Sequence, residues 1–373
     1  MKIKDVKASI LSCPLKEPFE DATKFFAERK MVLVEIFTDE GISGIGEAIS
    51  AGGPPIITKN IIEKELKEFL IGEDPLNIGK LWTKMYYGTI KHGRKGALIA
   101  SMSGIDIALW DIKGKKLEQP IYKILGGNRD KIPAYASAGF YATENPLRYL
   151  LQQAEEHIQK GFKAIKIKVG KLGLKNDLLR VREIKKLVGE DVVVMVDANT
   201  GYNIYEAIKM GRLLDSLDIR WFEEPFKADD LENYCELRKK IDTPLSAGEN
   251  EFTRYGHKEL ILRRAVDIVQ PDVAWSGGIS ETYKIATIAS IQNMFCIPHS
   301  FSTIIALVAN LHLNCGIENS LYQEYDQQGD NPLRDELINE QIKIDAESYV
   351  SVPQGPGLGI TINQDVFQRY LQE

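Results

Sequence analysis

The stretch Val192-Val-Val-Met-Val-Asp-Ala-Asn199 is apolar for five residues and then becomes polar. A fully apolar run of strand length is typical of a parallel strand that is buried on both faces. The residues before it have apolar side chains at helical spacing and end at Gly189, where a helix C-cap is expected. The stretch therefore predicts one helix-to-strand step of an α/β sheet, with polar groups at the carboxyl end of the strand.

The same pattern of strand and helix repeats from residue 131 to residue 335. We predict eight strands, of which the first seven are each followed by a helix, near residues 134–140, 164–170, 192–198, 219–224, 245–249, 267–272, 296–299 and 321–325. Alternation of this kind within one module favours an α/β barrel of the TIM type.

The residues on either side of this module have a different pattern. Residues 1–130 contain a strand at 31–37, a turn at Asp39-Glu-Gly41, a second strand at 42–48, and helical spacing at 61–70 and 97–112. This N-terminal part is therefore predicted to be α+β. The tail, residues 336–373, has no barrel pattern, and we expect it to pack back on the N-terminal domain.

Composition excludes several classes of protein. The 373 residues are 44% hydrophobic and 27% charged with a net charge of −6, so we expect an ordinary globular protein that binds no nucleic acid. The four cysteines show no CxxC spacing, which predicts reduced thiols. Since neither a signal peptide nor an 18-residue apolar run is visible, we expect a cytoplasmic protein with no membrane partner.

Polar residues recur where the predicted strands end. They are Lys166 and Lys168, then Asp197 and Asn199, Glu223, Glu249 and Asn250, Asp272, His299, and finally Glu324. From Lys168 onward successive steps are 23 to 29 residues, the length of one βα unit. Because the carboxyl ends of barrel strands open on one face, these side chains are predicted to meet around one mouth.

Asp197, Glu223 and Glu249 come from three adjacent strands. Carboxylates this close would repel one another, and a divalent cation removes the conflict. Hard oxygen ligands favour Mg²⁺, and Mn²⁺ is also acceptable. A single acidic residue at a strand end is more often a helix N-cap or a solvated loop residue, but three at a regular spacing indicate a metal site.

The basic residues allow two interpretations each. Lys166 and Lys168 alternate with apolar residues, so they point to one side of their strand, either into the barrel or to solvent. His299 follows Asp272 by one βα unit and is either an oriented acid/base or a buried core histidine. His312 lies in an apolar helical run and is expected to pack in the core. The other histidines, His92, His157 and His257, are expected at the surface.

With these residues assembled, the sequence resembles the enolase superfamily, and within it the mandelate racemase subgroup that includes acid-sugar dehydratases. The motifs that carry the resemblance run in order along nearly the whole chain: Asp39–Glu47, Lys166-Ile-Lys168, Val196–Asn199, Trp221–Pro225, Gly248–Asn250, Gln270–Asp272 with Gly277-Gly278, Pro298-His299 and Glu324.

The resemblance implies a modified (β/α)₇β barrel and an α+β capping domain that the C-terminal tail completes. It also implies two mobile cap segments, about residues 16–30 and 49–60, which close over the mouth and select the substrate. Phe19, Phe25 and Phe26 of the first segment are either specificity residues or packing residues. Similar proteins are commonly dimers or octamers, so a homo-oligomer is implied as well.

The shared chemistry of such enzymes is removal of the proton α to a carboxylate with the help of Mg²⁺. By resemblance Lys168 is the base on one face, and repulsion from charged Lys166 is expected to lower the pKa of Lys168. His299 held by Asp272 is the acid/base on the other face. Glu324, if protonated, would donate a hydrogen bond to the substrate carboxylate. The resemblance further implies that Asn199 and Asn250 either contact the substrate or orient the ligands.

Two bases on opposite faces allow dehydration or racemisation. We favour a lyase, a hydro-lyase that converts an aldonic or aldaric acid to a 2-keto-3-deoxy acid, over an isomerase that racemises or epimerises a 2-hydroxy acid. A non-catalytic barrel that binds carboxylates is disfavoured because no acid/base group is missing. The muconate-cycloisomerase branch is also disfavoured, because it places a lysine on strand six and residues 270–278 contain none.

Overall fold

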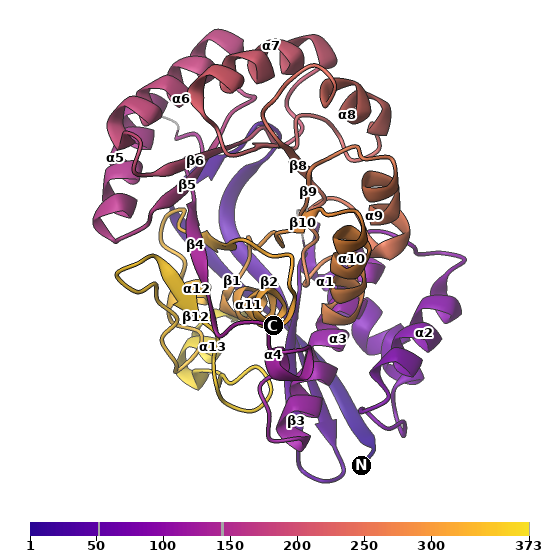
Figure 1. The fold of residues 1–373 in the computed structure, drawn as a ribbon. Helices are drawn as coiled ribbons and strands as arrows, with labels where there is room; N and C mark the ends of the chain where they lie inside the picture. The colour runs from indigo at the N-terminus through magenta and orange to yellow at the C-terminus, as the bar shows by residue number, and fades with distance from the viewer. Residues whose placement is uncertain (51–52, 143–144, 373) are drawn as a thin grey trace.

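The fold is that of a computed structural model, which describes residues 1–50, 53–142 and 145–372. A capping α+β domain lies against a parallel barrel sheet with helices outside it, as Figure 1 shows, and this confirms the predicted fold class. None of the helices within those ranges is long and apolar enough to cross a membrane.

The capping domain is built on an antiparallel sheet with the strand order β13-β1-β2-β3. The bounds of its strands are β1 (Ile3–Glu20), β2 (Phe25–Thr38), β3 (Ser43–Ala48) and β13 (Leu371–Gln372). The C-terminal residues thus complete this sheet by pairing with β1. Prediction missed β1 and began β2 six residues late, although Val6, Ala8 and Ile10 are buried at the alternate spacing typical of a strand.

Helices cover one face of this sheet. They are α1 (Pro55–Asn60), a π-helical turn (Ile61–Glu65), a 3₁₀ turn (Leu66–Phe69), α2 (Ile78–Thr89), α3 (Ala97–Lys116) and α4 (Ile121–Ile124). Helix α3 approaches β3 so closely that a Cβ atom added to Gly46 would lie 2.1 Å from the carbonyl oxygen of Gly104. Glycine in β3 therefore permits the contact between sheet and helix.

The barrel sheet has the strand order β10-β9-β8-β7-β6-β5-β4-β11, with parallel neighbours throughout. The eight strands coincide with the eight predicted ones: β4 (Lys131–Ser137), β5 (Ala164–Lys168), β6 (Val193–Asp197), β7 (Phe222–Glu223), β8 (Leu245–Ala247), β9 (Ile268–Val269), β10 (Phe295–Cys296) and β11 (Gln323–Asp326). Between β10 and β11 the amide of Cys296 donates to the carbonyl of Asn319.

Seven main helices follow the first seven strands, as predicted. They are α5 (Pro146–Gln159), α6 (Leu174–Val188), α7 (Ile204–Leu214), α8 (Leu231–Leu237), α9 (Thr253–Leu262), α10 (Ile279–Ile291) and α11 (Ile304–Gly316). A 3₁₀ turn (Asp215–Leu217) extends α7, and α12 (Pro332–Asp335) follows β11. In Figure 1 helices α5 to α10 form a ring outside the barrel strands. The carboxyl ends of the strands lead into loops on one face of such a barrel, where a site can form.

The C-terminal segment contacts both parts of the molecule. Strand β12 (Tyr349–Ser351) pairs antiparallel with β4 of the barrel, while α13 (Gln364–Tyr370) leads into β13 of the capping sheet. The amide of Leu358 donates to Asp111 of α3 at 2.9 Å. The tail therefore joins the barrel to the capping domain rather than packing on the capping domain alone.

The long hairpin of β1 and β2 reaches the barrel mouth. In Figure 1 the indigo hairpin crosses the ring of barrel strands, and a bridge between Glu20 and Tyr141 places its tip beside the segment that follows β4. The predicted cap segment 16–30 is thus mostly strand. The predicted segment 49–60 ends in α1, and its residues 51–52 lie outside the described residues.

The histidine predictions were correct in part. His312 is fully buried and bonds the backbone of Tyr122 and Leu358, so it is a core residue as predicted, and His92 is exposed. The surface prediction was wrong for His157 and His257, which are both buried. His257 lies on the face of α9 that meets the barrel and contacts the carbonyl of Gly248 at 3.1 Å.

Candidate active site

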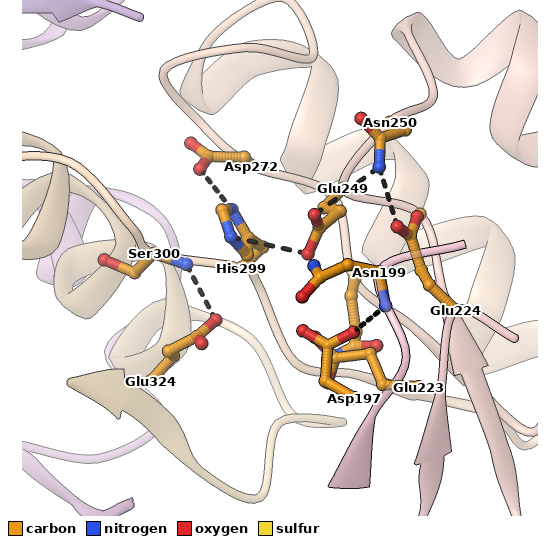
Figure 2. Close-up of polar contacts among 12 residues, drawn as sticks. Asp197, Asn199, Glu223, Glu224, Glu249, Asn250, Asp272, His299, Ser300 and Glu324 are labelled. Carbon is orange, nitrogen blue, oxygen red and sulfur yellow. Dashed lines mark hydrogen bonds and ion pairs between the residues drawn. The ribbon is translucent and has the colours of Figure 1, made fainter. Parts of the chain in front are cut away.

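Three carboxylates meet at the carboxyl ends of adjacent strands. Asp197 ends β6, Glu223 ends β7, and Glu249 lies two residues beyond β8. One oxygen from each lies within 4.8 Å of the others, and Figure 2 shows all three side chains turned toward a common centre. Because parallel barrel strands end together, the regular sequence spacing becomes a compact cluster in space.

Two neighbours fix the orientation of Glu223. Its Oε2 accepts hydrogen bonds from Trp221 Nε1 at 2.9 Å and Gln270 Nε2 at 2.8 Å. The other oxygen, Oε1, remains for the centre of the site. Sequence analysis assigned no role to Trp221 or Gln270, although Trp221 stands two residues before Glu223 and so shares its face of the strand.

The side chains of the two lysines of β5 point into the same cluster of carboxylates. Lys166 Nζ lies 2.5 Å from Glu223 Oε1 and 2.7 Å from Glu324 Oε1, and Lys168 Nζ lies 2.5 Å from Asp197 Oδ2. Both side chains are buried. The inward orientation is therefore correct, and solvent exposure was the wrong alternative.

The pKa of Lys168 does not follow the expected direction. Burial, the largest effect, and repulsion from Lys166 act to lower the pKa of Lys168, but attraction to the carboxylates of Asp197, Glu249 and Glu223 together outweighs them and raises it above its ordinary value. The expectation considered only the lysine two residues away, whereas the carboxylate in contact has the larger effect. Lys168 would become a base only if Asp197 were engaged elsewhere.

Asp272 and His299 form a pair on the other side of the site. His299 Nδ1 lies 2.8 Å from Asp272 Oδ2, and Nε2 faces Glu249 Oε2 at 3.4 Å (Figure 2). Burial alone lowers the pKa of His299, but the carboxylates of Glu249, Glu324 and Asp272 raise that pKa to about 10. The imidazolium therefore holds a proton on Nε2 that it can donate.

Glu324 is an acceptor in this structure. Burial would raise the pKa of Glu324, but Lys166 and His299 lower it to about 2, and the Ser300 amide donates to Oε2 at 3.0 Å. The condition under which Glu324 would donate a hydrogen bond, protonation of its carboxyl group, is not met in this structure, because Lys166 makes an ion pair with it. Lys166, rather than Glu324, is the hydrogen-bond donor at this point.

The charges around the centre are unbalanced in a way that suits a divalent cation. Five carboxyl groups, Asp197, Glu223, Glu249, Asp272 and Glu324, face three cationic groups, Lys166, Lys168 and His299. Burial raises the pKa of Glu223 to about 7 and also raises that of Glu249. Two positive charges would balance the cluster, and three hard oxygen donors fit Mg²⁺ or Mn²⁺.

A cavity of about 600 Å³ opens above these groups. Lys168, Asn199, Glu249, Asn250, Asp272 and His299 line its floor, and residues 21–30 of the hairpin line its roof. Asn199 is nearly buried, and the Asn250 amide donates to Glu224 at 2.7 Å. The structure thus brings all ten predicted site residues to one place.

Aromatic side chains form one wall of this cavity. Phe26, Phe140 and Phe301 pack together with ring centroids 5.3 to 6.0 Å apart. Phe19 is buried behind them and is a packing residue, whereas Phe25 is 56% exposed and lines the opening. Phe19 is therefore a packing residue, while a specificity role for Phe25 and Phe26, which line the cavity, stays a prediction.

Comparison with known families agrees with this architecture. The N-terminal domain of the mandelate racemase/muconate lactonizing enzyme family matches residues 5–126, and the enolase C-terminal domain-like family matches residues 149–366. The chain belongs to the mandelate racemase/muconate lactonizing enzyme family. It is thereby a member of the enolase superfamily, as the sequence motifs predicted.

Members of this family that resemble the chain have related activities. Arabinonate dehydratase from Saccharolobus solfataricus is 41% identical over 94% of this chain and 93% of its own length. D-galactarolactone cycloisomerase from Agrobacterium fabrum is 35% identical over 99% of both chains. L-talarate/galactarate dehydratase from Salmonella typhimurium LT2 has a TM-score of 0.89 and 31% identity over 100% of this chain and 92% of its own, and a mutant was solved with Mg and L-glucarate.

Proposed function

We propose that this protein is a Mg²⁺-dependent lyase that dehydrates an aldonic or aldaric acid to a 2-keto-3-deoxy acid. The observation that carries the proposal is that a three-carboxylate cluster meets, through Glu249, a cavity that is also lined by Lys168 and the Asp272–His299 pair. Two relatives named as acid-sugar dehydratases support the reaction class.

Asp197, Glu223 and Glu249 would hold the cation. When bound, it would attract the substrate carboxylate and stabilise the negative charge that develops there as the α-proton leaves. Trp221 and Gln270 keep Glu223 oriented for this role by occupying its second oxygen. Mn²⁺ fits the same oxygen donors.

Lys168 would take the α-proton. With Asp197 engaged by a cation, burial and the charge of Lys166 act on the ammonium group with less opposition, and both lower the pKa of Lys168. The neutral amine accepts the proton, and the electron pair of the C–H bond moves toward the carboxylate. Lys166 stays charged, because attraction to Glu223 and Glu324 outweighs burial and raises its pKa well above the ordinary value.

His299 would complete the reaction by acting as an acid. Its Nε2 proton passes to the β-hydroxyl group, the C–O bond breaks, and water leaves with that proton. The enol that remains gains a proton from solvent at carbon 3 and loses the proton of its hydroxyl group at carbon 2, which gives the 2-keto-3-deoxy acid. Asp272 accepts from Nδ1 throughout, so Nε2 is the nitrogen that faces the substrate. Asn199 and Asn250 lie where they can contact substrate hydroxyl groups.

The test is to incubate the purified protein with Mg²⁺ and a library of aldonic, aldaric and simple 2-hydroxy acids in D₂O, and to follow the α-proton by NMR. New 2-keto-3-deoxy signals would establish dehydration and identify the sugar. Loss of the α-proton signal without dehydration would favour the racemase or epimerase. No change with any acid, with Mg²⁺ binding retained, would favour a barrel that binds carboxylates without catalysis.

Two variants assign the roles of the acid/base groups. Lys168→Ala should abolish both α-proton exchange and dehydration, because no other predicted base lies on that face. His299→Ala should abolish dehydration while Lys168 still exchanges the α-proton with solvent. Full turnover by both variants would exclude the mechanism. Metal titration calorimetry shows whether each variant still binds Mg²⁺.

A further inference from the structure

We propose that Glu47 of the capping domain is a positioning residue that holds the loop bearing His299, and that dehydration by His299 depends on this contact. The inference rests on the proposed function for its kinetic part only. Glu47 lies in β3 of the capping domain, outside the barrel, and its side chain is completely buried.

The carboxylate of Glu47 binds the start of α11 at three points. Ser302 Oγ donates to Oε1, Thr303 Oγ1 donates to Oε2 at 2.5 Å, and the Ala306 amide donates to Oε2 at 2.9 Å. Both carboxylate oxygens of Glu47 therefore accept hydrogen bonds. One of them binds the Ala306 amide, an N–H group of the first turn of α11 that has no partner within the helix.

The same loop carries His299 only three residues before Ser302. At its first residues the loop is held by three bonds: the His299 amide donates to the Pro271 carbonyl at 3.1 Å, the His299 carbonyl accepts from Asn310 at 3.0 Å, and the Ser300 amide donates to Glu324. Beyond Ser300, Asn331 donates to the Ser302 carbonyl at 3.2 Å, and the Ile305 amide donates to Thr303 Oγ1 at 3.3 Å. The Ser302 and Thr303 hydroxyl groups themselves donate to Glu47. Loss of Glu47 would leave both hydroxyl groups and the Ala306 amide without this acceptor, directly after the loop that bears His299.

The contact also ties the loop to the cavity roof. Ile49 and Ser50, which directly follow the end of β3, line the cavity together with His299, Phe301 and Ser302. The Ile49 amide donates to the Ala274 carbonyl at 3.2 Å, in the loop that bears Asp272. One short stretch of the capping domain therefore contacts the loops of both members of the Asp272–His299 pair.

Glu47 has a matched counterpart without this connection. Asp111 of α3 is also buried, and its carboxylate accepts from the Ile45 and Leu358 amides at 3.0 and 2.9 Å. It joins the capping domain to the C-terminal tail and contacts neither catalytic loop. A general loss of capping-domain stability should therefore follow from either substitution, whereas displacement of His299 should follow only from loss of Glu47.

The test compares Glu47→Leu, Glu47→Gln and Asp111→Leu. Misplacing a catalytic group by about 1 Å costs roughly 100-fold in rate, so we expect Glu47→Leu to lose about that factor in kcat for dehydration with KM little changed. Exchange of the α-proton through Lys168 should remain close to that of the unchanged protein. Glu47→Gln should restore dehydration, because its amide oxygen can still accept from Thr303 and Ala306 while its NH₂ group donates to Ser302.

A measurement without substrate separates this inference from the proposed function. The ¹H–¹³C signal of the His299 ring is assigned by its loss in His299→Gln; it should shift or broaden in Glu47→Leu and stay in place in Asp111→Leu. If the unchanged protein processes no acid, the proposed function fails and this signal alone decides the inference. An unmoved signal, an equal fall of exchange and dehydration, or the same selective loss in Asp111→Leu would overturn it. If Glu47→Leu does not fold, Thr303→Val takes its place with the same expectations.

Discussion

Replacing Gln270 by leucine should weaken Mg²⁺ binding without removing any ligand. Gln270 Nε2 donates at 2.8 Å to the oxygen of Glu223 that points away from the cluster, and Trp221 donates to the same oxygen at 2.9 Å. Leucine has a similar volume and donates no hydrogen bond. Glu223 Oε2 would then be held by Trp221 alone, and the carboxylate could turn away from the cation.

The magnitude follows from the bond that is lost. A hydrogen bond to a charged group is worth about 1.5–3 kcal/mol, and each 1.4 kcal/mol is about tenfold in affinity. Loss of one of two such bonds should therefore weaken Mg²⁺ binding by about 10- to 100-fold, the range typical of residues that orient metal ligands. Isothermal titration calorimetry with Mg²⁺ measures the affinity directly.

Gln153→Leu provides the control for this measurement. Gln153 is a buried glutamine of α5 that accepts from the Gly139 amide and donates to Gln328, and it contacts no residue of the carboxylate cluster. Its substitution should leave Mg²⁺ affinity unchanged. The reasoning fails if Gln270→Leu binds Mg²⁺ as tightly as the unchanged protein, or if Gln153→Leu loses the same factor.

Three further predictions concern stability and the metal. Burial lowers the pKa of His312 to about 4. The stability that the neutral imidazole contributes is therefore complete above pH 6.5 and is lost as the pH falls toward 4, a loss of about 3 kcal/mol. The free energy of unfolding measured in urea should accordingly depend less on pH in His312→Gln than in the unchanged protein. Gly46→Ala should destabilise the fold by roughly 1–3 kcal/mol or more, because its Cβ would meet the Gly104 carbonyl, whereas Gly79→Ala, which meets nothing, should not lower the melting temperature. Glu249→Gln should weaken Mg²⁺ binding in calorimetry, and an unchanged affinity would remove Glu249 from the ligand set.

The barrel and the position of its polar residues could be predicted from the sequence because both depend on one period. A βα unit repeats along residues 131–335, and each repeat delivers its strand end to the same mouth. The side chains of Asp197, Glu223 and Glu249 are therefore brought together by topology, with no need to know the packing of individual side chains.

Features that depend on contacts between distant segments could not be predicted in the same way. The protonation of Lys168 and Glu324 is decided by partners at 2.5 and 2.7 Å, and sequence spacing does not specify which carboxylate each lysine meets. His257 appeared to be a surface residue because its contact, the Gly248 carbonyl, belongs to the neighbouring strand end. The roles of Gln270 and Glu47 likewise arise from contacts between elements.

The charge of the cluster connects the fold to the chemistry. Burying more carboxylates than cations at one barrel mouth is unfavourable in isolation, as the raised pKa values of Glu223 and Glu249 indicate. The same excess of negative charge would oppose the formation of further negative charge on a substrate carboxylate. A divalent cation beside Asp197, Glu223 and Glu249 would relieve both problems at once, and by engaging Asp197 it would also weaken the ion pair that this carboxylate makes with Lys168. The proposed metal site and the proposed lysine base would therefore both follow from one charge arrangement, so loss of any of the three carboxylates should impair proton removal as well as metal binding.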